Sequence, residues 1–373
     1  MSDRVFVFLE IFAREGGIQS YVKDVFAAYL QLDNQKAEVF LLRDEPGCDN
    51  PYQSSKLKFR YFKTDSPWQG RIKLAVALLQ CFLLRRPRHV YCGHIKLAPL
   101  VKLLCQPLGI PYTVLTYGKE VWQTLPPSEQ KALQQAQSIW TISRYSGDRL
   151  SKANNISADK IEILPCIVDG EQFTPGEKPA DLIERYGLQN SKVLMTVARL
   201  WSGDIYKGVD VTIRALPKIL QQHPDLKYLV IGRGDDRPRL EALAKELEVS
   251  DRVIFAGFVP TEELADHYRV ADAYIMPSQE GFGIVYLEAM ACGIPVLSGD
   301  SDGSADPLQD GLLGWRVPHR DVEAVATACI EILDFSDKRC NGEWLREQTL
   351  NKFSKQALQN KLAELLMQPT EVL

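Results

Sequence analysis

The sequence is poor in cysteine and contains no long apolar segment. Its 373 residues include eight cysteines, and no two of them have C-x-x-C spacing. This composition predicts neither a zinc site nor a disulfide framework and favours a reducing, cytoplasmic location. The longest apolar run, 72–84, is interrupted by Lys73 and Gln80. Because a membrane span needs about 20 consecutive apolar residues, this run does not predict one.

The chain as a whole has no large excess of positive or negative charge, although its two halves differ in net charge. The chain has 44 Lys and Arg against 48 Asp and Glu, a net charge of −4, so the whole molecule is not expected to bind nucleic acid. Residues 1–167 hold 22 basic and 15 acidic residues (net +7), whereas residues 168–373 hold 22 and 33 (net −11). This asymmetry, in a chain of this length, predicts two bodies with different roles.

Short β-rich runs alternate with amphipathic segments of helical length. The first part of the chain predicts strands and helices in turn, with strands at 5–9, 37–42, 89–92, 112–117, 138–143 and 160–165 and helices at 18–32, 70–84, 96–105 and 128–136. A second series follows, with strands at 192–200, 227–232, 252–257, 273–277 and 295–299 and helices at 209–222, 238–247, 261–269, 284–291 and 321–334. Such alternation predicts parallel sheets covered by helices.

A segment without helical periodicity separates the two series. Residues 165–180 contain three prolines and two glycines and are expected to join the domains. The fold class is therefore α/β, with two doubly wound, Rossmann-like domains: 1–167 and 168–349. Two such domains imply a central cleft, with ligands at the carboxyl ends of the strands.

Three segments contain residues that could carry chemistry. After the first predicted strand, Gly16 and Gly17 precede a helix. Glycine lets a ligand approach the backbone, and a helix N-terminus attracts anions. A simple tight turn explains the pair equally well.

The second segment places two cations around a strand-to-helix loop. Arg199 ends a predicted strand and Lys207 precedes the helix that begins near Gly208. Two cations in such positions can bind a diphosphate that a helix end also contacts. For either residue alone, a solvated loop is the simpler interpretation.

The third segment, 276–299, is the most informative. Glu280 and Glu288 are eight residues apart, and Gly281-Phe282-Gly283 lies between Glu280 and a predicted helix. The first amides of that helix, near Gly283 and Ile284, predict an anion site. Glu280 can reach past a phosphate, and Glu288 can accept the paired hydroxyls of a ribose.

These segments together resemble the retaining glycosyltransferases of family 4, which have the GT-B fold. The resemblance rests on the Glu280-x7-Glu288 pair, on Arg199 and Lys207 within VARL…YKG, and on the segments GGIQSYV, TISRYSGDRL and ILPCIVDGEQF. It covers essentially residues 5–335. The segment 353–367 predicts a further amphipathic helix, and the resemblance implies that this C-terminal helix, placed within 350–373, returns to join the first domain.

The resemblance also implies a role for each site residue. Arg199 and Lys207 would bind the donor diphosphate and stabilise the leaving group, and Glu280 would contact the donor sugar together with the amides next to it. Glu288 would hold the ribose. The other donor-binding positions implied are Gly17, Gly232, Gly234, Gly257, Phe258, Gly281, Phe282, Gly283, Ile284 and Val285.

One position departs from the family pattern. Tyr117, in LTYGKEVW, stands where many members have a histidine near the reacting sugar. A tyrosine can bind a sugar hydroxyl but is a poor base at neutral pH. His94 is a second candidate for the acceptor side, with a structural histidine as the alternative. The departure concerns acceptor chemistry more than donor binding.

The expected reaction is hexosyl transfer from a nucleoside diphosphate sugar, with retention of anomeric configuration and without a metal or other cofactor. Cations and the helix end would stabilise the leaving group, as a metal does elsewhere. The nearest D-x-D, Asp300-Ser301-Asp302, follows a late strand. Among donors a UDP-hexose is expected, and the acceptor would be a saccharide or a lipid-linked saccharide.

Alternative functions are a sugar-nucleotide epimerase, a phosphorylase and a non-catalytic sugar-nucleotide-binding protein. A nicotinamide-dependent dehydrogenase would need G-x-G-x-x-G after the first strand, which is absent. Five basic residues flank the run 72–84: Arg71, Lys73, Arg85, Arg86 and Arg88. They suggest peripheral contact at the inner face of an anionic membrane, and an ordinary packed helix with solvated ends is the alternative.

Overall fold

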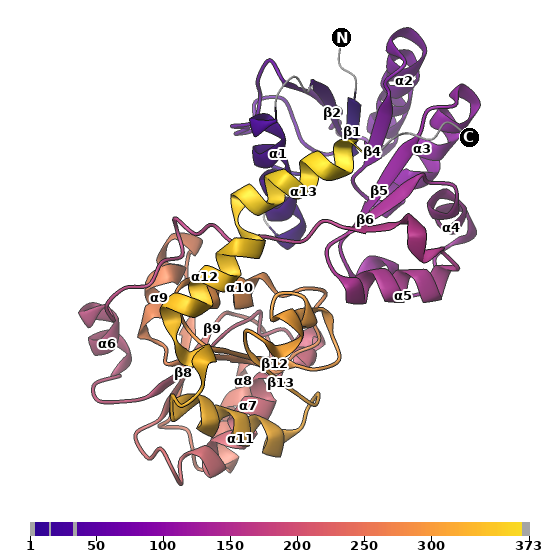
Figure 1. Cartoon of the computed structure of the whole chain (residues 1–373). Helices are drawn as coiled ribbons and strands as arrows, with labels where there is room; N and C mark the ends of the chain where they lie inside the picture. The colour runs from indigo at the N-terminus through magenta and orange to yellow at the C-terminus, as the bar shows by residue number, and fades with distance from the viewer. Residues whose placement is uncertain (1–3, 15, 33–35, 368–373) are drawn as a thin grey trace. The chain divides into compact units, whose positions relative to one another are not determined.

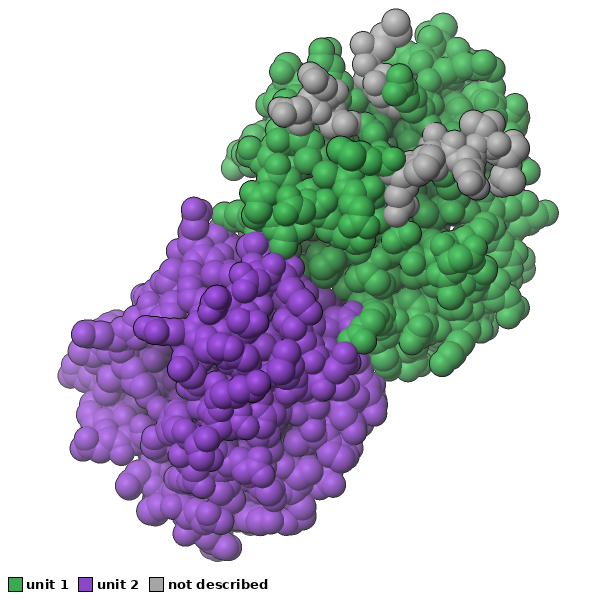
Figure 2. All heavy atoms as spheres, in the orientation of Figure 1, with its two compact units in different colours: residues 1–167, 355–373 green, residues 168–354 purple. Residues whose placement is uncertain are grey.

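The computed structural model describes residues 4–14, 16–32 and 36–367. The chain divides into two compact units (Figure 2): unit 1 is residues 1–167 with 355–373, and unit 2 is residues 168–354. Each unit is an α/β body around its own parallel sheet.

Unit 1 contains a seven-stranded sheet with the order β3-β2-β1-β4-β5-β6-β7. All of its strand pairs are parallel. The strands are β1 (Arg4–Phe8), β2 (Ala37–Leu41), β3 (Leu57–Tyr61), β4 (His89–Cys92), β5 (Tyr112–Thr116), β6 (Ser138–Thr141) and β7 (Ile161–Ile163). β2, β4 and β5 are buried along their whole length, as expected for strands covered on both faces.

The helices of unit 1 are α1 (Gly17–Gln31), α2 (Pro67–Arg85), α3 (Ala98–Cys105), α4 (Pro127–Gln134), α5 (Arg144–Asn154) and α13 (Lys355–Met367). The C-terminal helix α13 packs beside α1 (Figure 1). The Arg4 guanidinium also donates a hydrogen bond of 3.0 Å to the Leu366 carbonyl. These contacts return the end of the described chain to its first sheet.

Unit 2 contains a six-stranded parallel sheet with the order β10-β9-β8-β11-β12-β13. Its strands are β8 (Val193–Val197), β9 (Lys227–Ile231), β10 (Val253–Gly257), β11 (Ala273–Met276), β12 (Val296–Gly299) and β13 (Trp315–Val317). Its helices are α6 (Ala180–Tyr186), α7 (Val209–Ile219), α8 (Arg237–Glu246), α9 (Leu264–Val270), α10 (Ile284–Ala291), α11 (Val322–Leu333) and α12 (Gly342–Phe353). Figure 1 shows α7, α8 and α11 on one side of this sheet and α9, α10 and α12 on the other.

The prediction of two doubly wound α/β domains is confirmed, although some elements were not predicted. These are the strands β3 and β13 and the helices α5, α6 and α12. The amphipathic helix predicted over 353–367 is α13, which begins at Lys355, whereas residues 350–353 belong to α12; residues 368–373 lie outside the described part. Across the described residues, the structure has no helix long and apolar enough to cross a bilayer.

Candidate active site

The candidate site of unit 2 lies where the strand order reverses. β8 and β11 are neighbours in the sheet. The strand that follows β8 in the chain, β9, lies on the other side of β8, and the strand that follows β11, β12, lies on the other side of β11. The strand order therefore reverses between β8 and β11. In open parallel sheets, ligands bind at the carboxyl ends of the strands at such a reversal. Arg199 comes after β8 and Glu280 comes after β11, so both flank this point.

An ion pair joins the two sides of the reversal. Lys207 is the last residue of the short 3-10 helix η5 (Ser202–Lys207), and its ammonium contacts the Glu280 carboxylate. Their side chains are 17% and 16% exposed, so the pair is only partly hydrated. The backbone amide of Glu280 donates to the Asp302 carboxylate at 2.6 Å, which fixes the loop that carries Glu280.

Arg199 contributes a second cation to the same side. Its guanidinium lies 2.8 Å from the Asp204 carboxylate, yet the Arg199 side chain remains 70% exposed. Asp204 itself is buried. An exposed guanidinium fixed by a buried carboxylate can donate its other N–H groups to a diphosphate oxygen.

Helix α10 begins directly after the Glu280 loop with no side chain capping it. Gly283 precedes the first turn with φ of 94°, and a Cβ there would lie 2.5 Å from the Tyr286 ring. Only glycine fits this position, and no side chain caps the first amides of the helix, those of Ile284 and Val285. Together with the helix dipole, these amides form an anion-binding position. Phe282 is buried, and its ring packs edge-on against Phe353.

Glu288 lies one turn further along α10. Its carboxylate accepts a hydrogen bond of 2.8 Å from the Tyr268 hydroxyl. Burial raises the pKa of the Glu288 carboxyl to about 7, although the Tyr268 hydrogen bond acts in the opposite direction. Burial also raises the pKa of Asp302 to about 6. Two carboxyl groups near this edge therefore titrate close to neutral pH.

The adjacent strands present small residues and one exposed ring. Gly232 and Gly234 follow β9, and a Cβ on Gly234 would lie 1.8 Å from the Leu200 carbonyl oxygen. Gly257 ends β10, and the next residue, Phe258, is 62% exposed. The Arg233 guanidinium lies 4.8 Å from the centroid of the Phe258 ring. A flat exposed ring beside a cation is a suitable surface for stacking a nucleobase.

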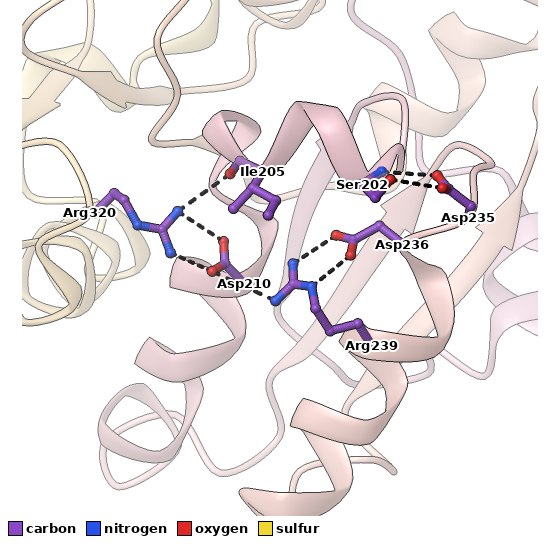
Figure 3. Close-up of polar contacts among 7 residues, drawn as sticks. All are labelled: Ser202, Ile205, Asp210, Asp235, Asp236, Arg239 and Arg320. Atoms are coloured by element: carbon purple, nitrogen blue, oxygen red, sulfur yellow. Dashed lines mark hydrogen bonds and ion pairs between the residues drawn. The ribbon is translucent and has the colours of Figure 1, made fainter.

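A polar network supports the η5 loop, and sequence reasoning missed it (Figure 3). Arg320 donates to Asp210 at 2.5 Å and to the Ile205 carbonyl at 3.4 Å. Arg239 makes a bidentate pair with Asp236 at 2.6 and 2.7 Å, and it also lies 4.0 Å from Asp210.

The other end of the loop is held separately. Ser202 donates from its amide and hydroxyl to the Asp235 carboxylate at 2.9 and 2.8 Å. A small pocket lies beside this network and is lined in part by Arg199, Lys207, Asp210 and Arg239. The one sequence signal that could have pointed to the network is the position of Asp235 and Asp236 shortly after the predicted strand 227–232.

Three of the predicted site residues lie in unit 1, at the carboxyl ends of its strands. Gly17 is the first residue of α1, and a Cβ there would meet open space. The imidazole Nδ1 of His94 accepts from the Lys96 amide at 3.1 Å. Burial, together with the charges of Arg43 and Lys96, lowers the His94 pKa to about 4. His94 is therefore neutral at pH 7 and caps the helical turn that follows it.

Tyr117 is largely buried within unit 1. Its hydroxyl donates to the Gly93 carbonyl at 2.8 Å, and its ring packs edge-on against Tyr21. Burial raises its pKa well above the usual value. Tyr117 is therefore uncharged at neutral pH, and the contact that its hydroxyl makes in this structure is with the backbone.

The chain is similar to known glycosyltransferases. The family described as "Glycosyl transferases group 1" matches residues 191–334. A GDP-mannose-dependent alpha-(1-6)-phosphatidylinositol monomannoside mannosyltransferase of Mycolicibacterium smegmatis is 36% identical over 265 residues, which cover 67% of this chain and 68% of that protein. A GDP-mannose-dependent monoacylated alpha-(1-6)-phosphatidylinositol monomannoside mannosyltransferase of Corynebacterium glutamicum is 29% identical over 342 residues, 86% of each chain.

Solved structures share the fold over nearly the whole chain. The crystal structure of Anabaena HepE in complex with UDP has a TM-score of 0.76, covers 98% of this chain and 99% of its own, and is 18% identical. WaaG, a glycosyltransferase involved in lipopolysaccharide biosynthesis, has a TM-score of 0.64 and 17% identity, with 98% of this chain and all of its own chain covered. At these identities the likeness shows the fold, which is GT-B.

Proposed function

Because this chain belongs to the group 1 family of glycosyltransferases, we propose that it transfers a hexose from a nucleoside diphosphate sugar to a lipid-linked saccharide. The observation that carries the proposal is the convergence of Arg199, Lys207 and the uncapped start of α10 at the strand reversal of unit 2. Three positive groups at one sheet edge suit a diphosphate.

Each donor contact follows from this arrangement. The diphosphate would lie against Arg199, Lys207 and the amides of Ile284 and Val285, and it would compete with Glu280 for the Lys207 ammonium. The displaced Glu280 carboxylate can then accept sugar hydroxyls. Glu288 would accept the ribose hydroxyls, and the base would stack near Phe258.

The reaction needs charge stabilisation more than a protein base. The bond between the anomeric carbon and the diphosphate oxygen breaks, and the electron pair leaves with the diphosphate. The acceptor hydroxyl attacks from the same face, so configuration is retained, and its proton passes to a departing phosphate oxygen. Arg199 and Lys207 stabilise the negative charge that develops on the leaving group, which makes a metal ion dispensible in this proposal.

The donor base is proposed from the curated relatives. The sequence alone favoured a UDP-hexose, but the names of the two relatives above specify GDP-mannose. We therefore propose GDP-mannose as the donor. The same names specify phosphatidylinositol mannosides, which supports a membrane lipid carrying a saccharide as the acceptor, met in the cytoplasm at the inner face of the membrane. Unit 1, with Tyr117 and His94, would serve the acceptor side.

A ligand screen followed by a transfer assay tests the proposal. GDP at 100 times its dissociation constant is expected to stabilise the protein by about 2.7 kcal/mol, and UDP and ADP at the same concentration by less. GDP-mannose with a mannosylated lipid should yield GDP and a longer saccharide, with or without excess chelator. Stronger stabilisation by UDP would overturn the donor assignment. Donor conversion without any acceptor would indicate an epimerase, and nucleotide binding without turnover would indicate a binding protein.

A further inference from the structure

Helix α2 of unit 1 is apolar on two opposite faces. Its inner face is buried in the unit 1 core through Gly70, Leu74, Ala77, Leu78, Cys81 and Phe82. Its outer side exposes a second apolar set at helical spacing: Trp68 (70% exposed), Ile72 (55%), Val76 (48%), Leu79 (41%) and Leu83 (57%). We call these five residues the outer stripe of α2. At 3.6 residues per turn they fall within a sector of about 80°.

The outer stripe is not a normal feature of a surface helix. Single exposed apolar residues are common, but a helix on the surface of a soluble domain usually turns a polar face to water. Here five large apolar side chains follow one another along nearly the full length of α2, which is labelled in Figure 1. Contiguous exposed apolar surface of this kind marks an interaction site.

The charge around the outer stripe has one sign. Residues 66–88, which are α2 and the residues next to it, contain five Lys and Arg and no acidic residue. Arg85 is paired with Glu38 on the neighbouring strand β2. Among the residues that the structure describes, Arg71, Lys73, Arg86 and Arg88 form no ion pair.

From these observations we propose that the outer stripe of α2 docks on the surface of an anionic lipid bilayer. The helix would lie in the plane of the interface, with the stripe among the acyl chains and the flanking cations at the phosphates. Trp68, at the start of α2, has the amphipathic ring that favours this interface. Long basic side chains can reach the headgroups while their stems stay apolar.

A bilayer fits the charge better than a second copy of the chain does. If two outer stripes packed together, Arg71, Lys73 and Arg86 of one copy would approach the same cations of the other, and like charges at an interface are unfavourable. Binding to an anionic membrane instead becomes more favourable by about 1 kcal/mol for each Lys or Arg near its surface. The same argument predicts that binding weakens as salt is raised.

This inference deepens the proposed function, because a lipid acceptor requires access to a membrane. It can nevertheless fail separately. The binding test uses vesicles without donor or acceptor, whereas the transfer assay can use an acceptor dispersed in detergent. An enzyme that transfers mannose but does not bind vesicles would overturn only the docking surface, and a protein that binds vesicles but does not transfer would overturn only the function.

The test is cosedimentation of the full chain with vesicles of phosphatidylcholine, with and without added phosphatidylglycerol. The wild type is expected to bind the anionic vesicles and not the neutral ones. The double variant Ile72→Ser/Leu83→Ser should bind at least about tenfold more weakly, because it removes two large apolar side chains from the stripe. Arg71→Gln/Lys73→Gln should bind several-fold more weakly and lose part of the salt dependence.

Leu312→Ser is the matched control, since Leu312 is a similarly exposed leucine (46%) in unit 2. It should bind within twofold of the wild type, and all variants should keep the wild-type melting temperature because they alter exposed side chains. Equal vesicle binding by the stripe variant and the wild type would overturn the proposal. So would a wild-type dimer in solution that the stripe variant abolishes, because the stripe would then be a self-association surface.

Discussion

Glu288 is a carboxyl group whose proposed role conflicts with its surroundings. To accept ribose hydroxyls it should be ionised, yet burial raises its pKa to about 7. Since one pKa unit corresponds to about 1.4 kcal/mol, keeping Glu288 ionised above neutral pH costs stability. A carboxyl retained at such a cost is typical of a binding position rather than of the core.

The sign of its pH dependence follows from the raised pKa. The folded pKa lies above the usual value for glutamate, so the contribution of Glu288 to stability is full below the unfolded pKa and is lost as pH rises through about 7. Glu288→Gln, which can still accept from Tyr268, should therefore be more stable than the wild type at pH 8, by at most about 3 kcal/mol. Near pH 4 the two proteins should melt alike.

Nucleotide affinity should change with pH in the opposite direction to the stability contribution of Glu288. The wild-type affinity for the free nucleoside diphosphate should rise as pH increases from about 6 to about 8, because Glu288 becomes ionised over that range. Glu288→Gln should bind more weakly and show a flatter profile. Calorimetry at several pH values measures this, and a variant that keeps both the wild-type affinity and the wild-type pH profile would remove Glu288 from the ribose site.

At the scale of one element, the η5 loop is held at two points outside itself. Asp210 at the start of α7 and Arg320 after β13 fix its middle, and Asp235 after β9 fixes its beginning (Figure 3). Lys207 at its end is therefore positioned by residues that have no proposed contact with the donor. Arg320 acts in this view as a positioning residue.

Removing the Arg320 guanidinium should lower transfer without removing any donor contact. Arg320→Met leaves Asp210 with only the more distant Arg239, and we expect a loss of about 1–3 kcal/mol of stability and roughly tenfold of kcat/KM. Arg320→Lys should recover part of both. In a Lys207→Ala background, Arg320→Met should cost no further activity, because its effect passes through Lys207. An additive loss in the double variant would contradict the positioning role.

The elements that the sequence predicted are the ones with strong periodicity. Buried strands such as β2 and β5 are short runs rich in apolar and β-branched residues, and their predicted bounds were within one residue of the structure. β3 was missed because it is only five residues long and carries two charged residues, Lys58 and Arg60, so that it lacks the apolar run by which the other strands were predicted. α12 was missed because only Leu345, Thr349 and Phe353 of its twelve residues are buried, which leaves a weak apolar pattern.

In the candidate site, too, some residues could be predicted from the sequence and others could not. Arg199, Glu280 and Gly283 could be named from the sequence because each follows a recognisable strand or precedes a recognisable helix. The support of the η5 loop could not be predicted, since Asp210 and Arg320 are 110 residues apart and meet only in the folded sheet. The exposure of the α2 stripe was equally hidden, because an apolar helix of this length could have had both faces buried.

At the scale of the whole molecule, the proposed donor contacts belong almost entirely to unit 2, and Tyr117 belongs to unit 1. Its hydroxyl bonds the Gly93 carbonyl, and its ring packs on Tyr21. Tyr117→Phe removes one buried hydrogen bond, which should cost about 1 kcal/mol and lower the melting temperature by a few degrees. The affinity for free GDP should stay within twofold of the wild type.

Unlike the GDP affinity, the transfer rate should change in Tyr117→Phe, since we place Tyr117 on the acceptor side. We expect Tyr117→Phe to lower the transfer rate by a modest factor, between about twofold and tenfold, through the acceptor KM rather than the donor KM. Glu288→Ala in unit 2 is the matched comparison and should weaken GDP binding at least tenfold. A large loss of GDP affinity in a well-folded Tyr117→Phe would place the residue at the nucleotide. An unchanged transfer rate with a lower melting temperature would reduce its role to holding Gly93 in the core of unit 1.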